Sequence, residues 1–168
     1  MQALYDELQS LDVPLVCAGG VGDSNGLQQG LDIGYSACQL GTRFIASKEC
    51  QASEFYKQAI LNAKESDIVL SERITGVPVA VINTDYIKRS GLQSGWLARR
   101  MLSGNKTKHW MRTIYALKSI WQLKKSLLDE TGERDYWQAG KSVAGIDSIE
   151  SCDAIIRNLM QHFEFETK

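Results

Sequence analysis

The sequence has little of what defines membrane, secreted and metal-binding proteins. None of its apolar runs approaches the roughly 18 residues that a membrane-spanning helix needs. Residues 1–11 are mixed polar, without the basic start and apolar centre of a signal peptide. The four cysteines, Cys17, Cys38, Cys50 and Cys152, show no CxxC or other metal-ligand spacing. We therefore expect no metal site, no membrane association and a reduced, cytoplasmic chain without disulfides.

Excess charge is also absent. The formal net charge is −1 over 168 residues, so nothing global attracts nucleic acid or an anionic membrane. One stretch departs from this balance, because residues 86–128 contain ten Lys or Arg residues and no Asp or Glu. Basic residues interleaved with Trp96, Trp110, Tyr115 and Trp121 fit a nucleic-acid surface. Helical spacing of the aromatics instead favours a packed helix with a solvated basic face, so we expect no nucleic-acid partner. Attraction of an anionic substrate or carrier is a third interpretation of that face.

Catalytic constellations are equally scarce. Only two histidines occur, and we interpret both His109 and His162 as surface or helix-end side chains. No Ser-His-Asp or paired-carboxylate arrangement stands out. Glu49, Glu54 and Asp67 are better explained as helix-start or loop charges. The residues themselves therefore predict no catalytic group.

What the sequence does contain is two consecutive βα steps that end on glycine. An apolar run over residues 14–18 ends on Gly19-Gly20, and a helical pattern follows. A second run over residues 36–40 ends on Gly41-Thr42. Glycine lets backbone N–H groups approach a ligand closely, and the following helix directs its positive dipole end to the same place. Loops after the last two strands of (β/α)8 barrels often form a phosphate site of this kind, here interpreted as a flavin nucleotide site.

These motifs resemble those of a known family. AGGVGDSNGL at residues 18–27 and QLGTRFIAS at residues 39–47 look like the seventh and eighth strand loops of FMN-dependent barrels. They are most similar to the nitronate monooxygenases, also called 2-nitropropane dioxygenases, with flavin-dependent enoyl-acyl carrier protein reductases as close relatives. The likeness continues through residues 55–59, 74–78 and 137–142. The resemblance covers most of this chain, but it corresponds to only the carboxyl-terminal part of the family's architecture.

The resemblance implies a fold and a domain organisation. We expect an α/β chain that is the carboxyl-terminal portion of a (β/α)8 TIM barrel, as a fragment or a shortened gene, because only two βα units are present. Residues 1–65 would hold these βα units, residues 66–135 a hairpin and a mainly helical cap, and residues 136–168 a return segment and final helix on the barrel. A self-contained α/β protein with a barrel ancestor is the alternative.

Local patterns predict the individual elements. Periodic leucines indicate a helix over residues 1–11, and residues 68–70 and 79–82 indicate two strands that pair as a hairpin. Helix caps are expected at Asp23 or Ser24, at Ser47 for a helix reaching about residue 64, and at Ser151 for the last helix. The buried face predicted for the helix after Ser47 consists of Ala52, Phe55, Tyr56, Ala59, Ile60 and Ala63. The buried face predicted for the last helix consists of Cys152, Ile155, Ile156, Leu159, Met160 and Phe163.

The resemblance also implies the residues that bind FMN. They are the two loops that match the family's motifs: Ala18, Gly19, Gly20, Val21, Gln39, Leu40, Gly41 and Thr42. Backbone N–H groups and the Thr42 hydroxyl would donate to the phosphate, and Gln39 would meet ribityl or ring oxygens. Arg43 either neutralises the phosphate or forms a structural ion pair behind the loop. Lys141, where the family usually has Gln, and Ser142 are expected near flavin or substrate, with Lys141 beside oxygens or facing solvent.

The activity implied is FMN-dependent oxidation of alkyl nitronates, a small-molecule substrate, with O2. The family's catalytic histidine lies on a strand loop upstream of the motifs present here, so we expect the isolated chain to be inactive. Enoyl-thioester reduction with a nicotinamide is the alternative activity, and a non-catalytic flavin-phosphate binding or interaction module is the alternative of another class. Unpaired strand edges also predict self-association, unless the missing half or the hairpin over residues 68–82 pairs with them.

Overall fold

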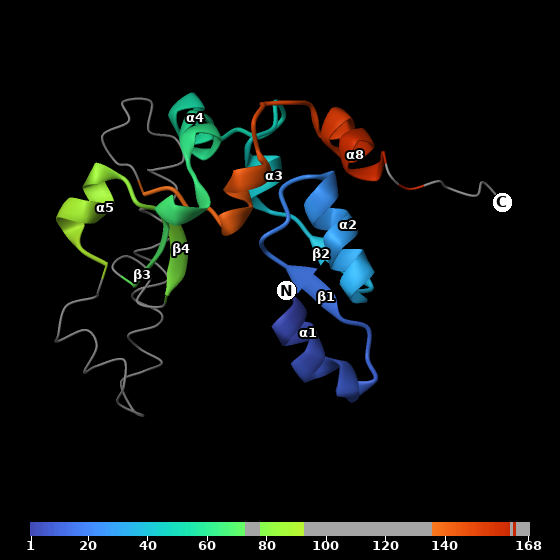
Figure 1. The fold of residues 1–168 in the computed structure, drawn as a ribbon. Coiled ribbons are helices and arrows are strands. Elements are labelled where there is room, and N and C mark those ends of the chain that lie inside the picture. The colour runs from blue at the N-terminus through green and yellow to red at the C-terminus, as the bar shows by residue number, and fades with distance from the viewer. Residues whose placement is uncertain (73–77, 93–135, 162, 164–168) are drawn as a thin grey trace, which may run out of the picture. The chain divides into compact units, whose positions relative to one another are not determined.

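The computed structural model describes residues 1–72, 78–92, 136–161 and 163, and it contains two compact units. The first unit comprises Met1–Gln51 and Gly140–Lys168, and the second unit comprises Ala52–Ala139. Most of the basic stretch, with His109 and His162, falls outside the described residues and is drawn as a grey trace (Figure 1). Within the described part, no helix has the length and apolar character needed to cross a membrane.

Two parallel strands form the centre of the first unit. β1 (Val16–Ala18) pairs with β2 (Ala37–Gln39), and Cys17 lies opposite Cys38. The helix α2 (Ser24–Ile33) connects them and lies beside the sheet (Figure 1). A helical crossover of this kind is what parallel strands require. The predicted α/β class is therefore confirmed, although both strands are shorter than the apolar runs suggested.

Asp23 determines where α2 begins. Its carboxylate accepts a hydrogen bond of 2.8 Å from the backbone N–H of Gly26, so Asp23 rather than Ser24 is the cap. The helix ends at Gly34, whose φ of 116° is left-handed, as is common at a helix end. An added Cβ on Gly30 would lie 2.7 Å from the Cys38 sulfur. The missing side chain of Gly30 thus lets α2 lie close to β2.

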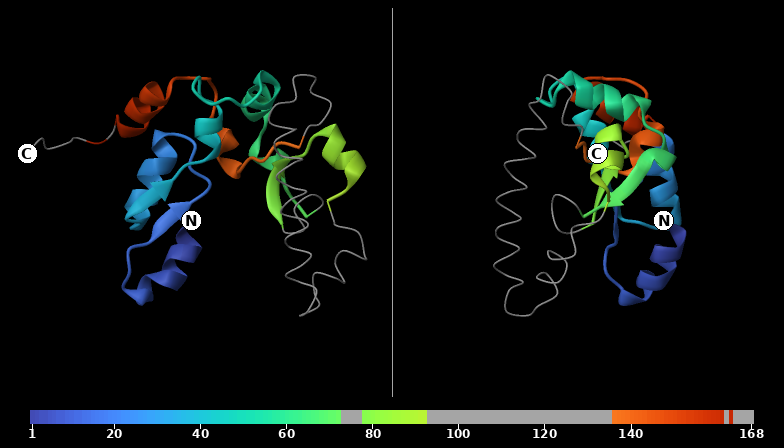
Figure 2. Two further views of the ribbon diagram at one scale, coloured as in Figure 1. Left: turned by 180° about the vertical axis from the view of Figure 1, so that it is seen from behind. Right: turned by 90° about the vertical axis from the view of Figure 1, so that its left-hand side faces the viewer.

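The core of the first unit joins the sheet, α2 and the last helix, α8 (Cys152–Met160), which lies near α2 in the view from behind (Figure 2). Ser151 caps α8 as predicted, accepting from the N–H of Ala154 at 3.2 Å. Ile156 was expected in the core but is 52% exposed, because each residue turns ~100° around a helix and Ile155 points inward instead. The buried members of this core are Cys17, Val21, Leu27, Tyr35, Ile155 and Leu159.

An aromatic contact and a hydrogen bond of 3.2 Å from the Tyr35 hydroxyl to the Met1 carbonyl attach the amino-terminal helix to this core. α1 (Gln2–Leu8) continues into a 3-10 turn, η1 (Gln9–Leu11), which confirms helical structure over residues 1–11. Neither element buries a residue. Tyr5 packs edge-on against Tyr35 with ring centroids 5.2 Å apart, whereas Leu4 and Leu11 are 56% and 60% exposed. The periodic leucine side of α1 is thus largely uncovered.

The helix predicted to start at Ser47 is wrong at its amino-terminal end. Ser47 lies in a turn, where its hydroxyl donates to the Phe44 carbonyl at 2.7 Å and accepts from the Cys50 N–H at 3.2 Å. Helical structure is divided instead between α3 (Thr42–Ile45) and α4 (Glu54–Asn62). Ser53 caps α4, since its hydroxyl accepts from the Tyr56 N–H at 3.3 Å. A serine at a turn and a serine at a helix start make the same local bond, and the sequence alone did not distinguish them.

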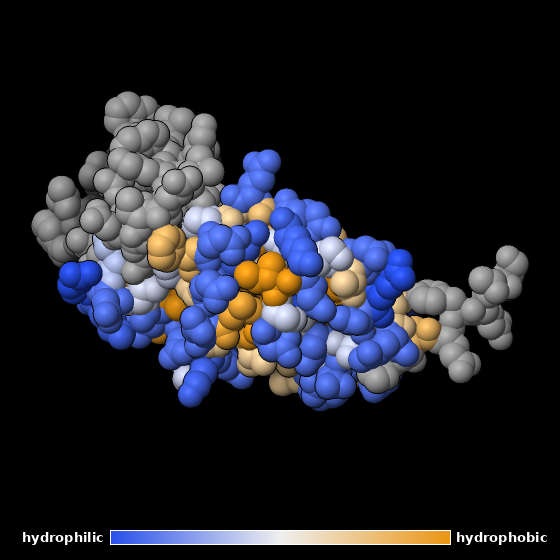
Figure 3. Space-filling view, turned by 90° about the horizontal axis from the view of Figure 1, so that it is seen from above, coloured by the Kyte–Doolittle hydropathy of each residue, from blue (hydrophilic) through white to orange (hydrophobic). Residues whose placement is uncertain are grey.

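The second unit packs α4 beside an antiparallel pair of strands. Tyr56 and Ile60 are buried as predicted, but Phe55 is 50% exposed and does not belong to the inner face. After a 3-10 turn, η2 (Glu65–Asp67), the strands β3 (Ile68–Ser71) and β4 (Val79–Ile82) pair antiparallel, which confirms the predicted strand pair. A short helix, α5 (Asp85–Ser90), follows, and Val81, Ile87 and Tyr136 form the local core. Seen from above, the surface is largely hydrophilic with a limited apolar area (Figure 3).

Candidate functional site

Two glycine-bearing loops lie at the same edge of the β1–β2 sheet. The strands are parallel and Ala18 lies opposite Gln39, so the first glycine loop (residues 18–21) and the second glycine loop (residues 39–42) both follow strand ends at that edge. Gly19 and Gly20 have φ values of 90° and 80°. Side chains rarely tolerate this region of backbone conformation, so the shape of the first loop depends on glycine.

The space beside these glycines is open. A Cβ added to Gly19, Gly20 or Gly41 would have no heavy atom of the described chain within 4 Å. Gly22, just beyond the first loop, is different, because its added Cβ would lie 2.2 Å from the Ser142 carbonyl oxygen. Packing therefore explains Gly22, whereas the three loop glycines border room for a ligand.

The side chains of the two loops differ in burial: some are packed into the protein and others are exposed. Val21 is 1% exposed and fixes the first loop to the core. Thr42 is buried, and its hydroxyl accepts a hydrogen bond of 3.1 Å from the Gly140 N–H. A hydroxyl that accepts in this way retains its own hydrogen for donation. Gln39 is exposed at the end of β2, and Leu40 is half-buried.

The return segment (residues 140–145) contacts both glycine loops or their flanks. It contains the 3-10 helix η3 (Lys141–Gly145). Gly140 bonds to Thr42 on one side, and the Ser142 carbonyl packs on Gly22 on the other. Ser142 is buried and Lys141 is exposed. The structure thus brings together three segments that are far apart in the sequence.

Arg43 forms the structural ion pair that was one of its two predicted alternatives. Its side chain is buried and pairs with Glu150. The same guanidinium donates to the Ser148 carbonyl at 2.8 Å and to the Ala46 carbonyl at 3.4 Å. These bonds direct Arg43 away from the glycine loops and toward the chain that precedes α8. Sequence reasoning missed Glu150, because a partner 107 residues away leaves no local pattern.

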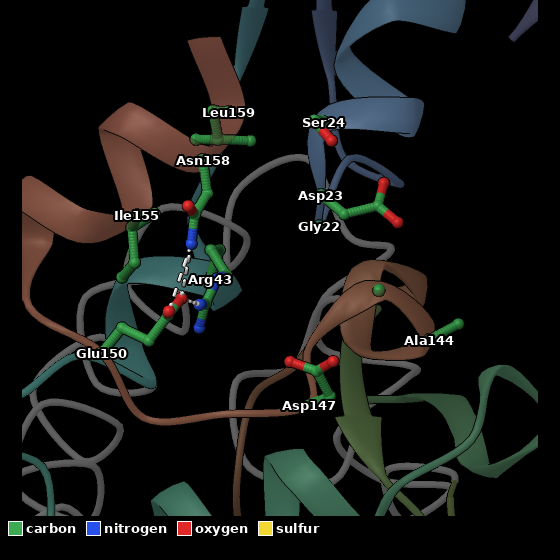
Figure 4. A pocket seen from close by; sticks show the side chains of 11 residues that line it. Gly22, Asp23, Ser24, Arg43, Ala144, Asp147, Glu150, Ile155, Asn158 and Leu159 are labelled. Carbon is green, nitrogen blue, oxygen red and sulfur yellow. Dashed lines mark hydrogen bonds and ion pairs between the residues drawn. The ribbon is translucent and has the colours of Figure 1, made fainter. Parts of the chain in front are cut away.

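A polar cavity of about 250 Å³ is lined by residues that follow the two glycine loops, among them Gly22 and Arg43 (Figure 4). Glu150 stands between Arg43 and Asn158 on one side of it, and Asp23 lies on the other (Figure 4). Asp147 adds a third carboxylate to the lining, against the single guanidinium. This excess of negative charge repels phosphate. A phosphate site is therefore not expected in this cavity.

The pKa shifts of two further groups, Glu49 and Cys38, are explained by their surroundings. The Glu49 carboxylate accepts from the Cys152 N–H at 3.0 Å, at the first residue of α8, and this bond lowers the pKa of Glu49. The sequence predicted Glu49 as a helix-start or loop charge; it lies between α3 and α4 and bonds the start of α8, a helix 103 residues further along the chain. Burial, with Cys17 alongside, raises the pKa of the Cys38 thiol. Among the described residues, no group of three His, Cys, Asp or Glu side chains is placed to hold a metal ion.

Solved structures share this fold. FabK of Thermotoga maritima is 25% identical, with a TM-score of 0.72 over 96% of this chain and 48% of its own. A nitroalkane oxidase of Streptomyces ansochromogenes, 18% identical, has a TM-score of 0.71 over 95% of this chain and 42% of its own. The enoyl reductase domain of MlnA from Bacillus amyloliquefaciens, 14% identical, has a TM-score of 0.53. At these last two identities the likeness shows the fold alone. The fold therefore places this chain among α/β proteins that resemble these structures.

The family follows from the sequence comparisons. The family model described as nitronate monooxygenase matches residues 2–162, nearly the whole chain, and the chain belongs to this family, as the motifs predicted. A protein of Staphylococcus saprophyticus named "Probable nitronate monooxygenase" is 38% identical over 89 residues. That match covers 53% of this chain and 25% of the relative. The chain therefore corresponds to only part of the length of its relatives.

Proposed function

We propose that the two glycine loops bind the phosphate of FMN. The single observation that carries this proposal is the open space beside Gly19, Gly20 and Gly41 at the shared end of two parallel strands. Packing of the described chain gives no reason for glycine at Gly41, whose φ of −118° suits any residue. A ligand that touches the backbone supplies the reason.

Each loop residue has a role in this proposal. The first glycine loop offers the backbone N–H groups of Gly19, Gly20 and Val21, and α2 directs its positive end toward the same region. The Thr42 hydroxyl, held by Gly140, donates its hydrogen to a phosphate oxygen. Ala18 and Leu40 line the site, and Gln39 hydrogen-bonds ribityl or ring oxygens. Ser142 and the exposed Lys141 stand close to flavin or substrate, because the return segment contacts Thr42 and the flank of the first loop.

The whole protein to which this architecture belongs is proposed to oxidise alkyl nitronates with O2. Membership of the nitronate monooxygenase family over residues 2–162 supports this activity and a small-molecule substrate. FMN supplies the ring that accepts electrons from the substrate. In this proposal residues 1–65 and 136–168 belong to the end of a (β/α)8 barrel, and residues 66–135 form a hairpin and helical cap. Four free thiols support a reducing, cytoplasmic location.

Flavin retention by glycine variants of a full-length form of the protein tests the binding site. Gly41→Val places a branched side chain in the open space without straining the backbone, so it should abolish FMN binding and leave the unfolding midpoint unchanged. Gly20→Val should also abolish binding, with some loss of stability because its φ is 80°. Gln58→Val, on the exposed side of α4, is the control and should bind as wild type. Wild-type FMN stoichiometry in either glycine variant contradicts the proposal.

Enoyl-thioester reduction is a second candidate, favoured by the shared fold of the MlnA enoyl reductase domain. The two activities consume different co-substrates. Oxygen uptake with a nitronate supports the first, and oxidation of a nicotinamide with an enoyl thioester supports the second. A chain that binds FMN but supports neither reaction, even with its missing barrel part supplied, is a non-catalytic flavin-binding module.

A further inference from the structure

The second glycine loop leads directly into a helix of one turn. α3 has only four residues, and Gly41 at its start supplies no side-chain cap. So short a helix is not stable by itself, because its first turn fixes several backbone angles in return for a single hydrogen bond. Contacts with other parts of the chain must therefore determine where α3 lies, and with it the backbone of Gly41 and Thr42.

Arg43, the second residue of α3, makes contacts of this kind. Its side chain is buried, and its guanidinium donates to the Ser148 carbonyl at 2.8 Å and pairs with the Glu150 carboxylate (Figure 4). Glu150 is held in turn, since its carboxylate accepts from the Asn158 amide at 3.1 Å and its backbone carbonyl accepts from the Lys48 N–H at 2.9 Å. The guanidinium thus joins α3 to the chain that leads into α8.

A second contact acts on Thr42 itself. Its hydroxyl accepts from the Gly140 N–H at 3.1 Å, which leaves the hydroxyl hydrogen for another acceptor. One contact leaves a short segment free to rotate about it, and the bonds of the adjacent Arg43 remove that freedom. This matters for binding, because groups that recognise a ligand must be held within about 0.5 Å of the productive geometry.

We infer that Arg43 is a positioning residue of the phosphate site, and that it acts through its bonds to Ser148 and Glu150 and not through its charge. The inference rests on the proposed function, because it concerns how the phosphate of FMN is held. A guanidinium that is paired with a carboxylate has little net charge to offer a phosphate. What the Arg43 side chain provides is the position of the Thr42 hydroxyl and of the open space at Gly41.

Binding that depends on the phosphate tests this inference. FMN carries the phosphate and riboflavin lacks it, so the ratio of their dissociation constants isolates the phosphate site. Fluorescence titration of a full-length form of the protein measures both constants, and we expect wild type to prefer FMN. Arg43→Lys keeps the positive charge but loses the planar fork that reaches Ser148 and Glu150 together. It should weaken FMN binding roughly tenfold, the loss of one hydrogen bond to a charged group, and leave riboflavin binding unchanged.

Glu150→Ala should change FMN binding in opposite directions for the two roles of Arg43. If the charge of Arg43 attracted the phosphate, loss of the neighbouring carboxylate would strengthen FMN binding. Positioning predicts weaker FMN binding instead, because the guanidinium loses an anchor. Asp147→Ala is the matched control, since Asp147 is an exposed carboxylate that lines the same cavity and accepts no bond from Arg43 in the described structure. It should leave the ratio of the two dissociation constants unchanged.

The outcomes separate the inference from the proposed function. A ratio that Arg43→Lys leaves unchanged, tighter FMN binding by Glu150→Ala, or equal weakening of FMN and riboflavin overturns the inference, since a general structural role affects both ligands alike. Circular dichroism shows whether each variant keeps its fold. Glu150→Gln retains an acceptor of the same shape, so where Glu150→Ala unfolds, the milder variant should still weaken FMN binding. Equal affinity of wild type for FMN and riboflavin contradicts the proposed phosphate site itself.

Discussion

Two glycines near the loops are explained in different ways. Gly22 is required by its neighbour, since an added Cβ would meet the Ser142 carbonyl at 2.2 Å. Gly41 has no such neighbour in the described chain, and Thr42 beside it already bonds Gly140. One glycine therefore serves folding, and the other is proposed to serve FMN. Substitution of Gly22 should therefore affect stability, whereas substitution of Gly41 should affect FMN binding.

The carboxylate of Glu49 should make stability depend on pH. Its bond from the Cys152 N–H favours the charged form, so the folded-state pKa of Glu49 lies below its unfolded value of about 4.3. Such a group stabilises the fold above the unfolded pKa and loses that contribution as pH falls through the folded pKa. Glu49→Gln should therefore destabilise the protein at neutral pH, and the difference from wild type should shrink below about pH 4.3.

Urea unfolding of wild type and Glu49→Gln between about pH 7 and about pH 3 measures this effect. Glu7→Gln, on the exposed side of α1, is the control. A difference in free energy of unfolding that stays constant across this range would show that the charge of Glu49 does not stabilise the start of α8.

Among the elements, α2 illustrates a conflict between helix propensity and packing. Gly30 lies inside the helix, where alanine is more favourable by about 1 kcal/mol. The added Cβ would however lie 2.7 Å from the Cys38 sulfur on β2. Overpacking of this kind costs about 1–3 kcal/mol. We expect Gly30→Ala to destabilise the protein despite its better propensity.

A double-mutant cycle tests this explanation. Cys38→Ala removes the sulfur, so in that background Gly30→Ala should become neutral or stabilising by up to about 1 kcal/mol. Urea unfolding of the four proteins gives the interaction energy. The same sign of effect in both backgrounds would mean that the Cys38 contact does not explain Gly30.

The isolated molecule should self-associate. Its open sheet face, unpaired strand edges and exposed apolar residues near the amino terminus have no cover in the described structure. Light scattering should give an apparent mass that rises with concentration, and Val16→Lys should reduce this rise. A concentration-independent monomer with cooperative unfolding would show that the chain is closed as it stands.

The isolated molecule should also be a poor catalyst. The described residues contain neither of the chain's two histidines, and the resemblance of the glycine motifs implies a histidine base upstream of them. Loss of a general base typically slows a reaction ~10²–10⁴-fold. With FMN and a nitronate, oxygen uptake should not exceed that of free FMN, whereas the full-length relative serves as the active control. Robust turnover by this chain alone would assign a role to His109 or His162.

Local features of this protein were determined by its sequence. The order of strands and helices, the glycines after each parallel strand, and the caps at Asp23 and Ser151 all depend on neighbours within a few residues. Hydrophobic periodicity and capping bonds act over that distance, which is why a linear pattern reveals them. Where one local pattern fits two structures, as at Ser47, prediction failed.

Only the tertiary structure decided the surroundings of the loops. The partners of Arg43, Thr42 and Gly22 lie about a hundred or more residues away, at Glu150, Gly140 and Ser142. The energies of such contacts arise when packing excludes water and brings distant groups within hydrogen-bonding reach, and no spacing in the sequence encodes them. For the same reason, the apolar leucines of α1 indicated a helix, but the folded arrangement determined that their side remains uncovered.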